Sequence, residues 1–146
     1  MFRNDAASRT VAGIIGERRA VVQPPSATVR QAAVVMVEHR IGAVPVVEGR
    51  HLIGIFTERD VLTRVVAAGC DIDLTRLEDV MTRRPETVSI ECPLLEALQV
   101  MMEGGFRHLP VMSGGLVAGV VSIRDIPVEI HAQHAAGTQP TALVGN

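Results

Sequence analysis

The sequence predicts an α+β fold in which two pseudo-symmetric β-α-β-β-α repeats pack sheet to sheet. The first observation is a repeated motif: Gly54–Asp60 (Gly-Ile-Phe-Thr-Glu-Arg-Asp) returns 65 residues later as Gly119–Asp125 (Gly-Val-Val-Ser-Ile-Arg-Asp). The second is that the alignment extends without a gap from Arg18–Val61 to Arg83–Ile126. The third is physical. A unit of about 45 residues leaves one sheet face bare, so two copies bury those faces against each other around a cleft.

The repeat also predicts how the 146 residues are divided. We expect flexible ends at residues 1–9 and 137–146, a first repeat at residues 10–69 and a second at residues 70–136. The length suffices for one compact unit with a good core. Aromatic residues make up only 2% of the chain, so the core must consist of Val, Ile, Leu, Ala and Met.

Apolar spacing and turn chemistry predict the elements of the first repeat. We expect a short helix at 10–15, a strand at 20–22, a helix at 28–39, strands at 43–47 and 52–56, and a helix at 58–67. Thr28 is a suitable N-cap for the second of these helices. Its buried side should carry Ala32, Ala33, Met36 and Val37, at i, i+1, i+4 and i+5.

The second repeat is expected to follow the same order after a polar connector. The predicted elements are a short helix at 77–81, a strand at 87–89, a helix at 93–103, strands at 109–112 and 116–121, and a helix at 124–135. Pro93 suits a first helical turn, where its missing N–H costs nothing.

Composition argues against several classes of partner. A net charge of −2 and the near absence of stacking aromatics disfavour nucleic acid. No apolar run approaches the roughly 18 residues of a membrane span, and the N-terminus lacks a signal peptide's apolar region. We therefore expect a soluble cytoplasmic protein. All 14 basic residues are Arg, which suits phosphate binding but equally fits a bias in genomic base composition.

The cysteines and the paired histidines suggest no metal. Cys70 and Cys92 are isolated in sequence, which predicts free thiols in a reducing compartment. His131 and His134 stand at i and i+3 of the last helix, with no further ligands nearby, so exposed helix residues are the better interpretation.

The repeated motif carries the most chemistry. Thr57 and Asp60, like Ser122 and Asp125, stand at i and i+3 where a strand becomes a helix. Helix capping is the simple interpretation. We expect these residues to bind a ligand as well, because both aspartates lie one turn inside the helix, where capping does not require them. A carboxylate there could accept two hydrogen bonds from a ribose diol, while the hydroxyl reaches ribose or phosphate. The neighbouring arginines, Arg59 and Arg124, would contact phosphate or simply be solvated.

These residues resemble a stand-alone pair of CBS domains (a Bateman module) over roughly residues 10–130. The matching segments are Ile41–Val47, Gly54–Asp60, Phe106–Val111 and Gly119–Asp125, with Asp79-Val80-Met81-Thr82 before the second repeat. Four segments in register, found in both copies, make the resemblance specific.

The resemblance implies adenosine-nucleotide binding in two clefts. One site would combine Ser122, Arg124 and Asp125 with Val21, Val22, Ile41, Gly42 and Ala43. The other would combine Thr57, Arg59 and Asp60 with Glu86, Thr87, Phe106, Arg107 and His108. In the family, the ribose is held by the hydroxyl and carboxylate of one repeat, and the base lies against the other repeat.

The two repeats differ at the positions nearest the expected ligand. The first has Gly42-Ala43 where the second has Arg107-His108. The small pair lets a flat base approach the backbone, whereas the basic pair would face phosphates or lie at a strand edge. Glu86 could disfavour phosphate or bind an amine. One site could thus be empty, or each could hold a different ligand.

The resemblance implies a regulatory sensor without catalysis. Its ligand would be AMP, ADP, ATP, NAD(H) or S-adenosylmethionine. It would form a homodimer through its helices, and with no effector domain attached it would act on an unknown partner in trans. Two alternatives stay open: a nucleotide-processing enzyme with an unrecognised site, and an interaction module with no ligand. Against the enzyme, the sequence has no Walker loop and no Ser/His/Asp or Cys/His arrangement.

Overall fold

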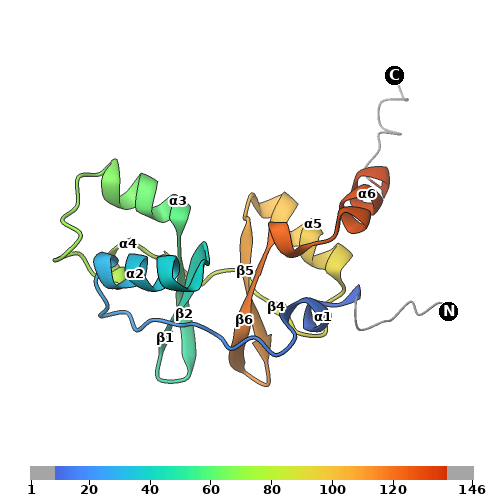
Figure 1. Ribbon diagram of the computed structural model, residues 1–146, viewed down its shortest axis with the longest axis horizontal. Helices are drawn as coiled ribbons and strands as arrows, with labels where there is room; N and C mark the ends of the chain where they lie inside the picture. The colour runs from blue at the N-terminus through green and yellow to red at the C-terminus, as the bar shows by residue number, and fades with distance from the viewer. Residues whose placement is uncertain (1–8, 138–146) are drawn as a thin grey trace.

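Two three-stranded sheets face each other at the centre of the computed structural model (Figure 1). It describes residues 9–137, so the flexible ends expected at 1–9 and 137–146 lie almost entirely outside it. One sheet contains β1 (Ala43–Glu48), β2 (His51–Thr57) and β3 (Thr82–Arg83); the other contains β4 (Val88–Ser89), β5 (His108–Ser113) and β6 (Leu116–Ser122). Strand β6 contacts β1 and β2. The predicted α+β fold, with repeats packed sheet to sheet, is confirmed.

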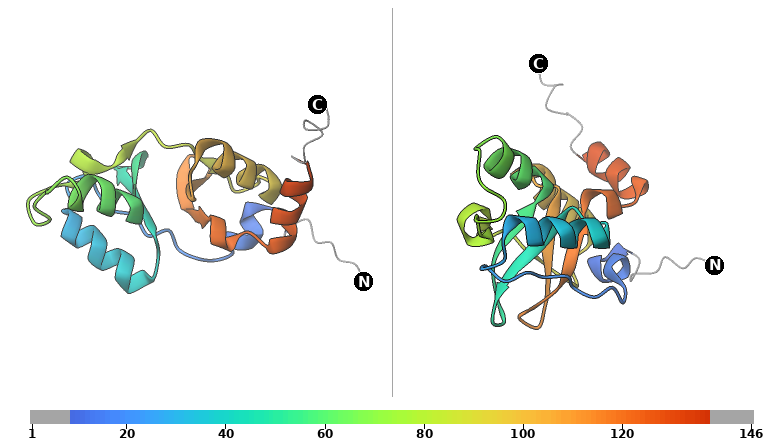
Figure 2. Two further views of the ribbon diagram at one scale, coloured as in Figure 1. Left: turned by 90° about the horizontal axis from the view of Figure 1, so that it is seen from above. Right: turned by 60° about the vertical axis from the view of Figure 1, so that its left-hand side comes forward.

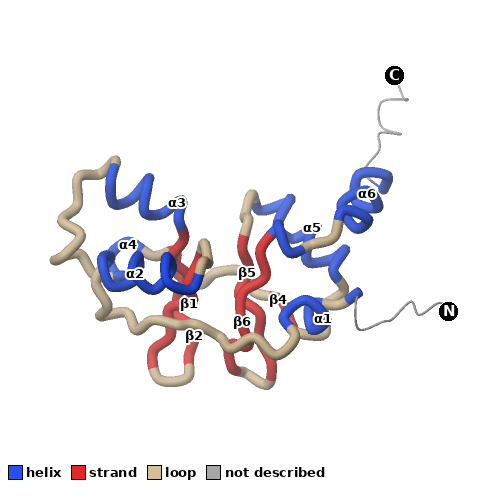
Figure 3. Tube along the Cα trace, viewed as in Figure 1, coloured by secondary structure: helices blue, strands red, loops and turns tan. Residues whose placement is uncertain are grey.

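Helical segments cover the outer side of each sheet (Figures 2 and 3). The first half contains α1 (Val11–Ile15), α2 (Val29–His39), α3 (Glu58–Asp60) and the π-helical η2 (Val61–Val66). The second half contains α4 (Leu77–Val80), α5 (Leu94–Gly104), the 3-10 turn η3 (Ile123–Asp125) and α6 (Val128–Gly137). Helix α2 begins at a capping box, in which Thr28 and Gln31 exchange side chain-to-backbone hydrogen bonds.

The two hairpins have the same register, and this places the repeated hydroxyls equivalently. Thr57 at the end of β2 pairs with Ala43, and Ser122 at the end of β6 pairs with His108. Each hydroxyl residue is thus held beside the first residue of the preceding strand. The position that differs most between the repeats, Ala43 against His108, lies directly across from it.

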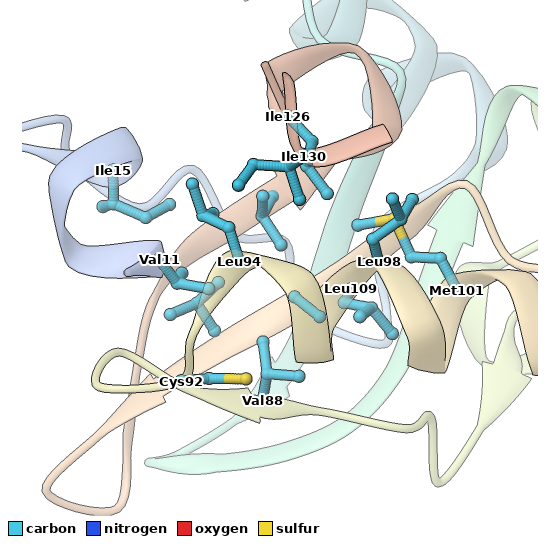
Figure 4. Packing of buried hydrophobic residues seen from close by; sticks show 13 residues of the cluster. Val11, Ile15, Val88, Cys92, Leu94, Leu98, Met101, Leu109, Ile126 and Ile130 are labelled. Carbon is cyan, nitrogen blue, oxygen red and sulfur yellow. The ribbon is translucent and has the colours of Figure 1, made fainter. Parts of the chain in front are cut away.

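The short leading helices are exchanged between the repeats. In Figure 4, Val11 and Ile15 of α1 pack with Leu94 of the second repeat, in one buried cluster. Helix α4 likewise packs into the first repeat's cluster, through Leu77 and other apolar residues. Backbone hydrogen bonds follow the same exchange: Val11 N–H donates to Cys92 O at 2.9 Å, and Leu77 N–H to Ala27 O at 2.9 Å.

Two expectations about the first repeat are wrong. Residues 20–22 form no strand; only Gln23 makes an isolated parallel bridge, with Val46. The following prolines have no N–H to extend a ladder. Val37, placed on the buried side of its helix, is 77% exposed, whereas Ala32 and Met36 are buried. The i+5 position lies at the margin of a helical stripe, where sequence spacing alone does not decide between core and surface.

The last predicted helix is interrupted. Instead of one helix at residues 124–135, the chain forms the turn η3, leaves helical geometry at Ile126 (φ −83°, ψ 124°) and restarts as α6 at Val128. The cause is Pro127, which lacks an N–H and disfavours α conformation in the preceding residue. The first repeat has Leu62 at this position, and its helix continues into η2.

Candidate functional site

A cavity of about 1160 Å³ lies between the repeats, and both predicted sites open into it. Of the predicted residues, the lining contains Ile41, Gly42, Ala43, Thr57, Arg59, Asp60, Glu86, Phe106, Arg107, His108, Ser122, Arg124 and Asp125. Val21, Val22 and Thr87 are not among the lining residues. Their part in binding stays a prediction.

In the first repeat, the hydroxyl and carboxylate of the motif bind each other. Asp60 Oδ2 accepts hydrogen bonds from Thr57 N at 3.0 Å and from Thr57 Oγ1 at 3.1 Å. Thr57 Oγ1 in turn accepts from Asp60 N at 3.1 Å. The aspartate is 6% exposed. This is a reciprocal capping box at a helix start.

In the second repeat, the same residues are bound more loosely. Asp125 Oδ2 accepts from Ser122 N at 2.8 Å, and Ser122 Oγ accepts from Arg124 N at 3.2 Å. The Asp125 side chain is 27% exposed, and its other oxygen lies 3.9 Å from Arg18 Nη1.

The argument that a cap has no need of these aspartates is therefore wrong. Asp60 and Asp125 both stand at the third helical position, where an acidic side chain caps the N–H of the residue that begins the helix. A capping role accounts for one oxygen of each carboxylate. Ribose binding can rest only on what remains of each group's hydrogen-bonding capacity.

Three groups converge at the middle of the cavity. A Cβ added to Gly42 would lie 2.6 Å from Glu58 Oε1 and 2.9 Å from His108 Nε2. The absence of a side chain at Gly42 thus leaves room for an acid from the first repeat and an imidazole from the second. Burial lowers the pKa of His108, a lowering that Arg107 adds to and the nearby Glu58 carboxylate partly opposes. The lowered pKa favours the neutral form of the imidazole.

Arginines surround this centre and link the repeats. Arg59 Nη1 donates to Gly105 O at 3.4 Å across the cavity. Arg18 is held by the carbonyls of Ile14 and Ile15 while its side chain lines the cavity. The remaining lining arginines are Arg40, Arg107 and Arg124. Such an array can bind an anionic group flexibly, since guanidinium groups form paired hydrogen bonds with phosphate oxygens.

Sequence reasoning missed Glu58, Arg18 and Arg40 as cavity residues. Glu58 was inside the repeated motif, but its counterpart is Ile123, so the repeat gave no reason to choose it. Arg18 does have a repeated counterpart, Arg83, which donates instead to Glu78 O. Only the packing of the two repeats brings Arg18 to Asp125.

The described residues hold no group of three or more His, Cys, Asp or Glu side chains arranged to bind a metal ion. Within the same part of the chain, none of the helices has the length and apolar character needed to cross a bilayer. The cavity's chemistry is that of hydroxyls, carboxylates, one imidazole and guanidinium groups.

Other proteins are similar to this chain in sequence. The chain is 32% identical to the CBS domain-containing protein YhcV of Bacillus subtilis, over 82% of this chain and 84% of that protein. It is 41% identical to the CBS domain-containing protein CBSCBSPB1 of Arabidopsis thaliana over 84% of its length, but spans only 22% of that relative.

A solved structure matches as well. The CBS domain protein PAE2072 from Pyrobaculum aerophilum, complexed with AMP, is 26% identical with a TM-score of 0.76, covering 87% of this chain and 98% of that one. The CBS domain family model matches residues 21–67 and 77–130, more than half of the chain. Two repeats with this sequence and this packing identify the chain as a member of the CBS domain family, with two CBS domains in tandem.

Proposed function

We propose that this protein is a regulatory module that binds an adenosine nucleotide between its repeats. The observation that carries the proposal is the cavity itself, in which hydroxyl–carboxylate pairs and arginines from both repeats face one space. The AMP complex of PAE2072, which has the same fold, supports an adenosine ligand. AMP, ADP, ATP and NAD(H) all present the adenosine that such a cavity can hold.

In the proposed complex, Ser122 and Asp125 bind the ribose, and the base lies on the first repeat's backbone beside Gly42. The phosphates extend toward the middle of the cavity, where guanidinium groups neutralise their charge and His108 can donate a hydrogen bond. The proposed contacts are the lining residues named above other than Asp60, together with Val21, Val22 and Thr87.

The proposed output is a change of geometry rather than a reaction. A ligand held by both repeats stabilises the relative orientation that it bridges, and it can shift the population of conformers only by that difference in affinity. Arg59, which already bonds to Gly105 O of the other repeat, lies where such a change would be transmitted. We propose that the signal reaches an effector protein in trans.

We further propose that the active form is a homodimer joined through the helices of the first repeat. Helices α2 and η2 pack into the same core cluster, yet each leaves apolar side chains exposed. On α2 these are Val34 and Val37, and on η2 they are Leu62 and Val66. The equivalent residues of the second repeat are Gln99, Met102, Pro127 and His131. Of these four equivalents, Met102 is also apolar and exposed, so the apolar face is more extensive on the first repeat. That difference favours pairing of like repeats about a twofold axis.

Calorimetry and native mass spectrometry on the purified protein test the nucleotide proposal. We expect binding of AMP, ADP, ATP or NAD, with GMP as the base control and adenosine as the control for phosphate. An Arg107→Gln/Arg124→Gln variant should weaken AMP at least tenfold and adenosine little. If none of the adenosine ligands binds at millimolar concentration, the proposal is wrong.

A further inference from the structure

The two aspartates of the repeated motif have different amounts of hydrogen-bonding capacity left. Asp60 Oδ2 already accepts two hydrogen bonds, from the backbone and the hydroxyl of Thr57. Its Oδ1 lies 3.5 Å from Arg64 Nε, in an ion pair one helical turn along. With the residue 6% exposed, little of this carboxylate faces the cavity.

Arg64 is itself held in place. Its Nη1 donates to Met81 O at 2.9 Å and to Val80 O at 3.4 Å, at the end of α4. A ribose that took Asp60 Oδ1 would have to compete with a guanidinium that two backbone carbonyls keep beside it. Arg64 does not line the cavity. It therefore occupies Oδ1 of Asp60 from the protein side and makes no contact with a ligand in the cavity.

Asp125 retains the capacity that Asp60 has lost. Its Oδ2 accepts the Ser122 N–H, and within residues 9–137 the ion pair formed by Oδ1 is the one with Arg18, at 3.9 Å. Exposed ion pairs of this length contribute little to stability, so a ribose hydroxyl can displace this one. Arg18 lines the cavity, and after displacement it can still contact the ligand's phosphate.

The difference between Asp60 and Asp125 arises from the residues that follow each of them in sequence. Four residues after Asp60 stands Arg64, whereas four residues after Asp125 stands Glu129, which cannot form the pair. In addition, the chain leaves helical geometry before Pro127, so the side chains beyond it no longer follow the line of η3. The second repeat therefore has no arginine at the position from which Arg64 pairs with Asp60.

We propose that each chain binds one adenosine nucleotide, at the Asp125 end of the cavity, and that Arg64 prevents Asp60 from serving as a second ribose site. This inference rests on the proposed nucleotide binding and deepens it. It makes Asp60 a capping residue, Asp125 the ribose ligand, and Arg64 the residue that determines the number of sites.

Titration calorimetry with AMP, checked by native mass spectrometry, tests the inference on the full chain. Wild type should bind one AMP per chain. Asp125→Asn should lose at least tenfold in affinity, while Asp60→Asn should bind AMP within about twofold of wild type and melt at a lower temperature. Arg64→Met should bind a second AMP. Arg83→Met, which removes an exposed arginine that does not line the cavity, is the matched control and should keep one site.

The outcomes separate the two proposals. Two AMP molecules per wild-type chain, or a loss in Asp60→Asn as large as in Asp125→Asn, would overturn the inference while leaving nucleotide binding intact. No binding of any adenosine nucleotide to wild type would overturn both. If Arg64→Met fails to fold, the wild-type stoichiometry and the comparison of the two asparagine variants still decide the matter.

Discussion

Glu58 and His108 approach each other from opposite repeats, and both lie within 3 Å of the point where a Gly42 side chain would begin. Replacing Gly42 by Ala should therefore fill the middle of the cavity. Because the contacted atoms are ends of side chains that can move, we expect the free energy of unfolding to change by less than about 1 kcal/mol. AMP affinity should fall roughly tenfold, about 1.4 kcal/mol. Calorimetry and urea denaturation on the same sample measure both, and unaltered AMP binding would contradict the prediction.

The lowered pKa of His108 predicts a loss of stability in mild acid. Its pKa in the folded protein lies below the ordinary 6.5, chiefly because of burial, so the unfolded chain binds the proton more readily. The stabilising contribution is therefore present above pH 6.5 and is lost as the pH falls through that value and toward the folded-state pKa. Urea denaturation between pH 8 and pH 5 should show this loss in wild type and a smaller one in His108→Gln. His131→Gln, on α6, serves as the control and should behave as wild type.

The different surroundings of the two motif glycines, Gly54 and Gly119, predict unequal costs of substitution. A Cβ on Gly54 would lie 2.5 Å from Met81 Sδ and 2.9 Å from the backbone oxygen of Thr82, whereas one on Gly119 would meet only Ile15, at 3.3 Å or more. Since backbone cannot yield as a side chain does, Gly54→Ala should cost about 1–3 kcal/mol of unfolding free energy, and Gly119→Ala less than about 1 kcal/mol. Thermal and urea unfolding measure both. Equal costs would show that the contact with the Thr82 backbone does not set the difference.

A charge on the exposed face of α2 should separate the proposed dimer. Val37 is 77% exposed, so Val37→Glu should leave the fold intact and place two carboxylates near the twofold axis. Light scattering after size exclusion should change from dimer to monomer. Val128→Glu, on the 74% exposed Val128 of α6, introduces the same charge away from this face and should remain dimeric. A wild-type protein that is monomeric at high concentration would refute the proposed interface.

The two thiols should react at very different rates. Burial, reinforced by the Glu96 carboxylate, raises the pKa of Cys92 to about 11, so almost none of it is thiolate at pH 8. Cys70 is half-buried, and both thiols are free. Iodoacetamide at pH 8 should label Cys70 first, as read by mass spectrometry, and label both cysteines in urea. Equal labelling of the native protein would show that Cys92 is not protected.

Much of the fold could be predicted because local signals and the repeat agreed. The hairpins follow from apolar runs joined by turn residues around Gly49 and Gly114, and α2 follows from its Thr28 cap. Pro127 predicts a helix break, but the analogy with the first repeat, whose helix continues, led to a single helix being expected at 124–135. Val37 could not be assigned, because an exposed valine and one in the core cannot be told apart by their apolar character.

The site was only partly predictable for a different reason. Position in the repeat identified Asp60 and Asp125, but their inequality depends on Arg64 and Arg18, which approach from different elements. Glu58 became a cavity residue because Gly42, far from it in sequence, leaves room. Such relations arise from the packing of one repeat on the other, and a motif alone does not contain them.

The exchange of α1 and α4 gives this duplicated chain a dependence that its sequence symmetry conceals. Each half carries a short helix that completes the hydrophobic core of the other half. Val11 of α1 packs beside Leu94, and Leu77 of α4 packs within the other cluster. A half cut out between the repeats would retain a β-hairpin and its longer helices but would leave its apolar core uncovered where the exchanged helix packs. Its core could be completed only if the missing helix came from a second copy, as happens in domain-swapped proteins. Covalent linkage of the two halves turns that exchange into an intramolecular event, so it proceeds at any protein concentration.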